Sequence, residues 1–280
     1  MLQALKYNQV LTWLLISKYK RKIMENKLSI KDVFTASFQT FIKHWKILLL
    51  SLLAYIGLLI FGAITYSAIS TAILVLIGGV KGKLTTETII IISPIIIIGS
   101  FILSFIYTAL WGGFIKIGLN ICKTGSAHIR DIFYCFSRMA FKLFSATILY
   151  QLLIVLGLTL LILPSLLFVG QPSVFLGAGF VEYILYRLLT ALGLILFVIP
   201  IYFAVKFSLY PYFIIDQDCG IIDSLTKSSR AVKNNFFNVL LIFLISLLLY
   251  FIPIISIPFI MLVWVYVYLM LKNSHGQIVQ

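Results

Sequence analysis

Long segments without a charged side chain constrain this chain more than any other feature. The first, from Ile47 to Val80, would extend about 51 Å as a helix, well beyond a bilayer core of about 30 Å. Of the 280 residues, 62% are hydrophobic and 11% are charged, whereas a soluble domain is about 45–50% apolar and about 25% charged. The excess apolar surface has to face lipid, so the sequence predicts an all-α, polytopic integral membrane protein.

Six apolar segments follow one another along the chain and are predicted to be transmembrane helices. The run from 47 to 80 is expected to give one tilted span, because two short spans there would reverse every later loop. Gly112-Gly113 is expected to end the second span and Pro164 the third, while Pro253 and Pro258 mark the turn between the last two. The expected spans are 47–69, 88–111, 143–163, 188–210, 237–252 and 256–271.

A single membrane domain is expected over residues 24–280, because no polar stretch is long enough to fold alone. Residues 1–23 are interpreted as an extension outside this fold. Their apolar run, Val10 to Ile16, is too short to span a bilayer, and its positive charges follow it instead of preceding it as in a secretory signal. Met24 is an alternative start of translation.

Lysine and arginine are distributed unevenly between the two sides that six spans define. Nineteen lie on the side that carries both termini and three on the other. Positive residues favour the cytoplasmic side of a membrane, so both termini are predicted to be cytoplasmic. The same distribution accounts for the net charge of +14 without nucleic acid as a partner, and it favours contact with anionic lipid headgroups.

Three basic segments with aromatic residues, 29–46, 132–144 and 218–235, precede apolar spans. They are predicted to be amphipathic helices that lie on the cytoplasmic surface of the bilayer. An ordinary cytoplasmic extension of the following span would give a similar pattern, and both interpretations stay open. The residues expected at the membrane surface are Trp45, Lys43, Phe144, Lys142, Phe236 and Lys233.

The first of these segments carries the clearest helical signals. Ser29 and Asp32 resemble a capping box in which Asp replaces Glu. Side chains three or four residues apart lie on one face of a helix. One face is therefore expected to carry the aromatic residues Phe34, Phe38, Phe41 and Trp45.

The three segments can be aligned on Asp32, Asp131 and Asp223, which are 99 and 92 residues apart. Each aligned block is followed by a predicted helical hairpin. The chain is therefore interpreted as three repeats of a surface helix plus a hairpin. The alternative is that any cytoplasmic helix entering a bilayer shows basic residues and then an aromatic anchor.

Few residues suggest chemistry. Asp216, Asp218 and Asp223 lie close together in sequence, near Lys227 and Arg230, and could bind a cation or a lipid headgroup. Capping of a helix by Asp218 and charge pairing along its first turn is the simpler explanation. The pattern predicts no catalytic residue, cofactor or metal site, since the histidines and cysteines are not clustered. The polar Gln151 and Asn238 are expected to bond neighbouring helices.

The segment from Leu194 to Asn235 resembles a group of bacterial multi-pass proteins. The similar residues are the run ending in Pro200, the segment Phe207 to Asp216 containing Pro211, the Ser224 to Arg230 helix containing Ser228, and Lys233-Asn234-Asn235. The group comprises families of the DUF975 type and the membrane domain attached to some glycerophosphodiester phosphodiesterases. The resemblance is clearest over 185–272, with Ile201 and Asn234 where glycine is usual. It implies a membrane fold in the bacterial cytoplasmic (inner) membrane and no activity.

These observations favour a non-enzymatic membrane protein that acts through lipid or protein contacts. A transporter or channel-like carrier of a neutral or apolar solute is the alternative, suggested by prolines within the spans. A lipid-modifying enzyme would depend on Asp216 and Asp218, the only acidic candidates at one interface.

Overall fold

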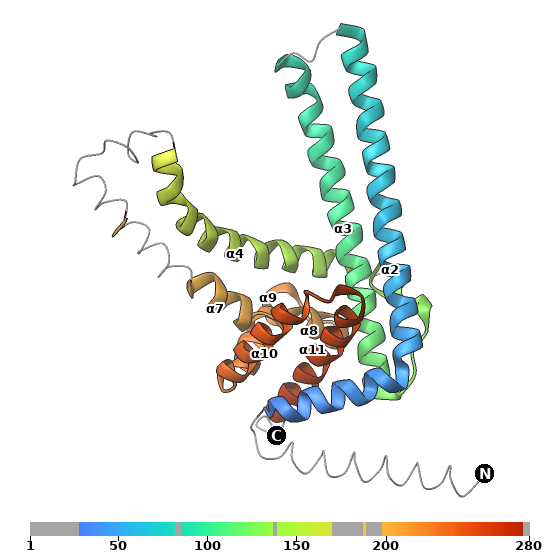
Figure 1. The fold of residues 1–280 in the computed structure, drawn as a ribbon, viewed down its shortest axis with the longest axis vertical. Coiled ribbons are helices and arrows are strands. Elements are labelled where there is room, and N and C mark those ends of the chain that lie inside the picture. Colours follow the sequence, from blue (N-terminus) through green and yellow to red (C-terminus); the bar gives the residue numbers. More distant parts are fainter. Residues whose placement is uncertain (1–27, 82–85, 137–138, 170–186, 189–197, 277–280) are drawn as a thin grey trace, which may run out of the picture.

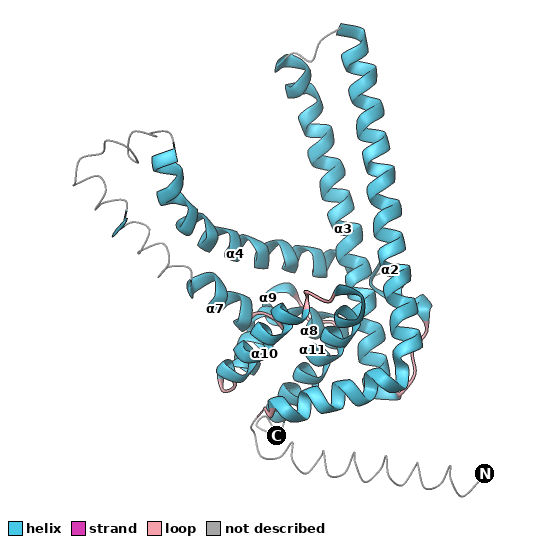
Figure 2. Ribbon diagram, viewed as in Figure 1, coloured by secondary structure: helices cyan, strands magenta, loops and turns pink. Residues whose placement is uncertain are grey.

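The computed structural model describes residues 28–81, 86–136, 139–169, 187–188 and 198–276. All regular elements in these ranges are helices, which confirms the predicted all-α class (Figure 2). The predictions for residues 1–23, for most of the loop after Pro164 and for much of the fourth span lie outside the described residues. The elements are α2 (Ile30–Lys81), α3 (Thr86–Thr124), η1 (Ile129–Phe136), α4 (Ala140–Val169), α7 (Val198–Lys206), α8 (Tyr210–Gln217), α9 (Ile221–Lys233), α10 (Phe236–Leu249) and α11 (Pro253–Gly276).

Helices α2 and α3 form a long hairpin that projects from a bundle of the shorter helices, while α4 extends in another direction (Figure 1). The uncharged run from 47 to 80 lies within one helix, as expected. Non-helical dihedral angles at His44 (φ −118°, ψ 16°) kink this helix. The part before the kink packs across the base of the bundle, and the part after it forms one arm of the hairpin.

The start of α2 is fixed by a local capping contact and by hydrogen bonds to residues far along the chain. The backbone N–H of Asp32 donates to Ser29 Oγ (3.4 Å), which is the capping contact that the sequence predicted. Leu28 is held on both sides: its N–H donates to Asn235 Oδ1 (3.0 Å), and its carbonyl accepts from Asn238 Nδ2 (2.8 Å). Asn238 was expected to bond a neighbouring helix, and its partner Leu28 lies two residues before α2 begins. Gln151, for which the same was expected, is exposed on α4.

The aromatic face of this first segment is divided between two environments. Phe34 and Phe41 both pack against Phe259 of α11, with ring centroids 6.1 Å apart in each case. Phe38 and Trp45 are 56% and 47% exposed. Half of the predicted face therefore packs within the protein, and the other half is available to lipid or solvent.

Helix α3 continues through Gly112-Gly113 to Thr124, beyond the expected end of the second span. The glycines allow η1 to lie directly on the helix. A Cβ atom at Gly113 would be 1.8 Å from the carbonyl oxygen of Ile132, a distance that no side chain permits. The expected surface α-helix over 132–144 is thus a 3-10 helix, η1, followed by α4 from Ala140.

The proline positions differ in part from their expected roles. Helix α4 runs through Pro164 to Val169. Pro200 is buried inside α7, and Pro211 lies in the first turn of α8, where its missing N–H costs no hydrogen bond. Pro253 begins α11 after the turn that follows α10, as expected for a hairpin, while Pro258 lies within α11.

Four helical segments are long and apolar enough to cross a membrane: Ile30–Ile73, Ser93–Thr124, Val198–Gln217 and Ile255–Lys272. The number rises to six if each of two bent pairs counts as one span. These pairs are η1 with α4, bent by 76°, and α9 with α10, bent by 103°. The described helices are therefore compatible with a multi-pass membrane protein.

The packed core lies at the base of the hairpin, where α2, α3, α8, α9 and α11 meet. Tyr268 and Phe114 are its largest fully buried side chains. Tyr268 packs against Tyr212 (5.7 Å) and edge-on against Phe213 (5.0 Å). This core positions the polar residues described next.

Candidate functional site

A concentration of polar contacts surrounds Asp216, at the end of α8. Its side chain is only 5% exposed. One carboxylate oxygen accepts from Lys123 Nζ of α3, and the other accepts from Lys272 Nζ (2.8 Å) and from the Tyr268 hydroxyl (2.8 Å) of α11. We call these four residues the Asp216 cluster. It joins three helices through one buried carboxylate.

A second buried polar contact lies at the start of α8, at the opposite end of this helix from Asp216, and is made by Ser228 of α9, which is fully buried. Its hydroxyl accepts from the Leu209 N–H (3.1 Å) and donates to the Lys206 carbonyl (3.1 Å). These two backbone groups lie at the junction of α7 and α8, where the helical hydrogen-bond pattern is interrupted. Ser228 therefore supplies the bonds that the interruption removes, and it links α9 to this junction.

Asp218 does not cap α9, contrary to the sequence-based interpretation. The residue before α9 is Gly220, and α9 has no side-chain cap. Asp218 instead ends α8 in the left-handed conformation (φ 52°), and its N–H donates to the Ile214 carbonyl (3.0 Å). Asparagine and aspartate tolerate this conformation better than most residues. The Asp218 carboxylate accepts from Lys142 Nζ of α4 (2.7 Å).

The predicted charge pairing in the first turn of α9 is confirmed. Lys227 Nζ lies 2.9 Å from Asp223 Oδ2, one helical turn away. The hydrogen bond from Lys227 lowers the pKa of Asp223. Lys227 also contacts Cys219 Sγ (3.1 Å) and Gln217 Oε1 (3.4 Å). Burial raises the pKa of the Cys219 thiol, so this cysteine stays protonated near neutral pH.

The geometry limits what these groups can do chemically. Both oxygens of Asp216 already accept hydrogen bonds from cationic or phenolic donors, so neither is positioned to take a proton from a substrate. Asp218 and Asp223 bind different lysines. Within the described residues, no group of three or more His, Cys, Asp or Glu side chains could hold a metal ion. The Asp216 cluster is a structural junction.

The residues expected at the membrane surface lie in different settings. Lys43, Trp45 and Lys233 are exposed, and Phe236 is half-buried against Tyr202 (5.4 Å). Phe144 is 9% exposed and packs edge-on against Phe101 (5.7 Å) and Phe105 (5.4 Å) of α3. Lys142 is half-exposed and bound to Asp218. Phe144 and Lys142, which were expected at the membrane surface, therefore make contacts within the protein.

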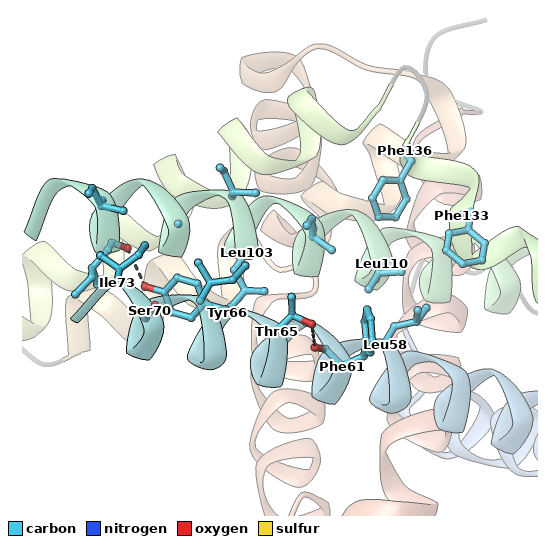
Figure 3. A pocket seen from close by; sticks show the side chains of 17 residues that line it. Leu58, Phe61, Thr65, Tyr66, Ser70, Ile73, Leu103, Leu110, Phe133 and Phe136 are labelled. Carbon is cyan, nitrogen blue, oxygen red and sulfur yellow. Dashed lines mark hydrogen bonds between the residues drawn. The ribbon is translucent and has the colours of Figure 1, made fainter. Parts of the chain in front are cut away.

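An apolar groove of about 470 Å³ runs between α2 and α3 (Figure 3). Its walls come from one face of each helix, and Phe133 and Phe136 of η1 border it at one end. Three hydroxyl groups lie on the walls. Two of them bond to the protein itself: Thr65 donates to the Phe61 carbonyl (2.8 Å), and Tyr66 donates to the Ile96 carbonyl (2.9 Å). The third belongs to Ser70. The groove therefore offers an apolar surface.

Sequence reasoning missed the partners of Asp216, because Lys123 and Lys272 are 93 and 56 residues away and no local pattern connects them. It also gave Gly112-Gly113 no role beyond ending a helix, although paired glycines within an apolar segment are a sign of close backbone approach. The groove had no sequence signal of its own.

No protein-family model, no curated protein sequence and no solved structure matches this chain.

Proposed function

We propose that this chain is a non-enzymatic integral membrane protein of the bacterial cytoplasmic membrane that acts through lipid or protein contacts. The observation that carries the proposal is the separation of polar and apolar surfaces. Large aliphatic and aromatic side chains are exposed along both arms of the α2–α3 hairpin, whereas the buried carboxylate of Asp216 is paired with Lys123 and Lys272. Such an exposed apolar surface is expected where lipid is the solvent.

Basic side chains support contact with anionic headgroups. Lys43 and Lys46 are exposed near the kink of α2, and Lys46 Nζ lies 5.9 Å from the ring centroid of Trp45. Arg230 and Lys233 are exposed at the end of α9. A lysine or arginine close to an anionic surface contributes about 1 kcal/mol to binding. In this proposal, both termini and these basic residues lie on the cytoplasmic side of the membrane. The chain then crosses the membrane six times, with each bent helix pair counted as one span.

Anionic lipid is expected to stabilise the folded chain. In nanodiscs that contain one third phosphatidylglycerol, we expect Tm to be about 3–6 °C higher than in phosphatidylcholine alone, because bound headgroups favour the folded state. Intrinsic tryptophan fluorescence during heating measures the difference. A K43Q/K46Q/K233Q variant should lose most of it, and identical Tm values for the wild-type chain in both lipids would contradict the proposal.

The groove between α2 and α3 is the observation that favours a carrier of a neutral or apolar solute as the second candidate. Its volume of about 470 Å³ falls within the range of about 300–1,000 Å³ for ligand sites. A carrier would have to expose such a site alternately to the two sides of the membrane.

The threefold repeat of a surface helix plus a hairpin is also a proposal. The three aspartates on which the repeats are aligned lie in an α-helix, a 3-10 helix and a second α-helix.

A further inference from the structure

We infer that the groove between α2 and α3 is a binding site for one acyl chain of an anionic phospholipid. This inference rests on the proposed function, since it requires the hairpin to lie in a bilayer. The groove follows the long axis of the hairpin (Figure 3). Its lining extends from Leu58 to Ile73 on α2 and from Ile95 to Leu110 on α3, which corresponds to about 22 Å of helix.

The shape and chemistry of the groove fit an extended hydrocarbon chain. One leaflet of a bilayer core is about 15 Å thick, so one acyl chain entering from the η1 end can occupy most of the groove. The lining is almost wholly apolar, and Ile69, Ile102 and Phe133 remain 55%, 57% and 54% exposed. A polar solute would leave its own hydrogen-bonding groups unpaired against these walls.

The width of the groove is set by a close contact at its middle. The ring of Tyr66 lies against Gly99, where a Cβ atom would be 2.6 Å from the ring. The Tyr66 hydroxyl bonds Ser100 Oγ (2.9 Å) as well as the Ile96 carbonyl. These contacts hold α2 and α3 together at the middle of the groove. The groove is therefore the space that is left between the two helices on one side of the hairpin.

Charge at one end indicates the class of headgroup. Lys116 Nζ lies 4.4 Å from the ring centroid of Tyr134, the residue that follows Phe133 on η1. In the described part of the chain, no carboxylate lies within ion-pair distance of Lys116. Lys116 lies six residues beyond Leu110, the last residue of α3 in the groove lining, which corresponds to about 9 Å of helix. A cation at this distance from the end of the groove, beside an aromatic ring, suits the phosphate of a lipid whose chain fills the groove.

Photolabelling of the full-length chain in vesicles tests this site. The probe is phosphatidylglycerol with a diazirine in one acyl chain, and labelled peptides are identified by mass spectrometry. Labels are expected to concentrate on the residues that line the groove. Ile69→Trp fills the groove and should reduce this labelling about fivefold or more. Ile64→Trp is the matched control: it lies on the same helix, is 63% exposed, does not line the groove, and should leave labelling unchanged.

The headgroup is tested with a second probe that carries the same chain on phosphatidylcholine. Lys116→Gln should reduce labelling by the phosphatidylglycerol probe about threefold and leave the phosphatidylcholine probe unaffected. Uniform labelling of exposed residues on α2 and α3 would overturn the acyl-chain site. That result would still be compatible with the proposed function, which is tested separately by the stabilisation of the chain in anionic lipid. Equal labelling by both probes in the wild-type chain would overturn the headgroup assignment.

Discussion

Asp216→Asn is expected to destabilise the folded chain by about 2–3 kcal/mol, which corresponds to a decrease in Tm of about 5–10 °C. The buried carboxylate is the common partner of Lys123 of α3 and of Lys272 and Tyr268 of α11. Removing one member of a buried ion pair usually costs about 3–5 kcal/mol. We place the cost lower because the lysine side chains are 37% and 33% exposed and can be partly hydrated once the carboxylate is gone.

The measurement is thermal unfolding of the purified chain in detergent, followed by tryptophan fluorescence. Asp223→Asn is the matched control, since it removes an exposed carboxylate whose partner Lys227 lies on the same helix. This control should leave Tm unchanged. If Asp216→Asn behaved like the control, the Asp216 cluster would not be the junction that joins α3, α8 and α11.

Gly113→Ala is expected to cost about 3 kcal/mol or more, because the new methyl group would collide with backbone atoms of Ile132. The nearest distances from a Cβ at this position are 1.8 Å to the carbonyl oxygen and 2.3 Å to the carbonyl carbon. Backbone atoms cannot move aside by rotating a side chain, so η1 would have to separate from α3. Reduced yield of monodisperse protein and a lower Tm in detergent would report this separation.

Gly57→Ala is the control for the same substitution. Gly57 lies in α2, and a Cβ there meets nothing within 4 Å. Because alanine favours a helix over glycine by about 1 kcal/mol, this variant should be as stable as the wild type or slightly more so. Equal stability of the two alanine variants would contradict the close approach of η1 to α3.

Local sequence patterns predicted the features that depend on neighbouring residues. The helical class follows from long apolar segments, the start of α2 from Ser29 and Asp32, and the turn after α10 from Pro253. The pairing of Asp223 with Lys227 follows from their spacing of one turn. Each of these depends on contacts within a few positions of the chain.

Features that depend on tertiary packing could not be read in the same way. Asp218 was interpreted as a helix cap because aspartate near a helix start usually has that role, but it ends the preceding helix and meets Lys142 of α4. The pairing of Asp216 with Lys272 depends on how α11 packs against the rest of the protein, which the local sequence does not indicate. The second span was predicted to end at Gly112-Gly113 because glycine often terminates a helix. In the structure these glycines lie within α3 and permit the tight packing of η1.

The most direct test of the central claim is the sidedness of two positions in a bacterial membrane. Cysteine is introduced singly at Lys233, at the end of α9, and at Thr86, at the start of α3. A membrane-impermeant maleimide is added to spheroplasts or to inverted vesicles, with the wild-type chain as the background. We expect Thr86→Cys to be labelled only in spheroplasts and Lys233→Cys only in inverted vesicles. Labelling of both cysteines from the same side would contradict a membrane-spanning α2–α3 hairpin whose lysine- and arginine-rich end lies in the cytoplasm.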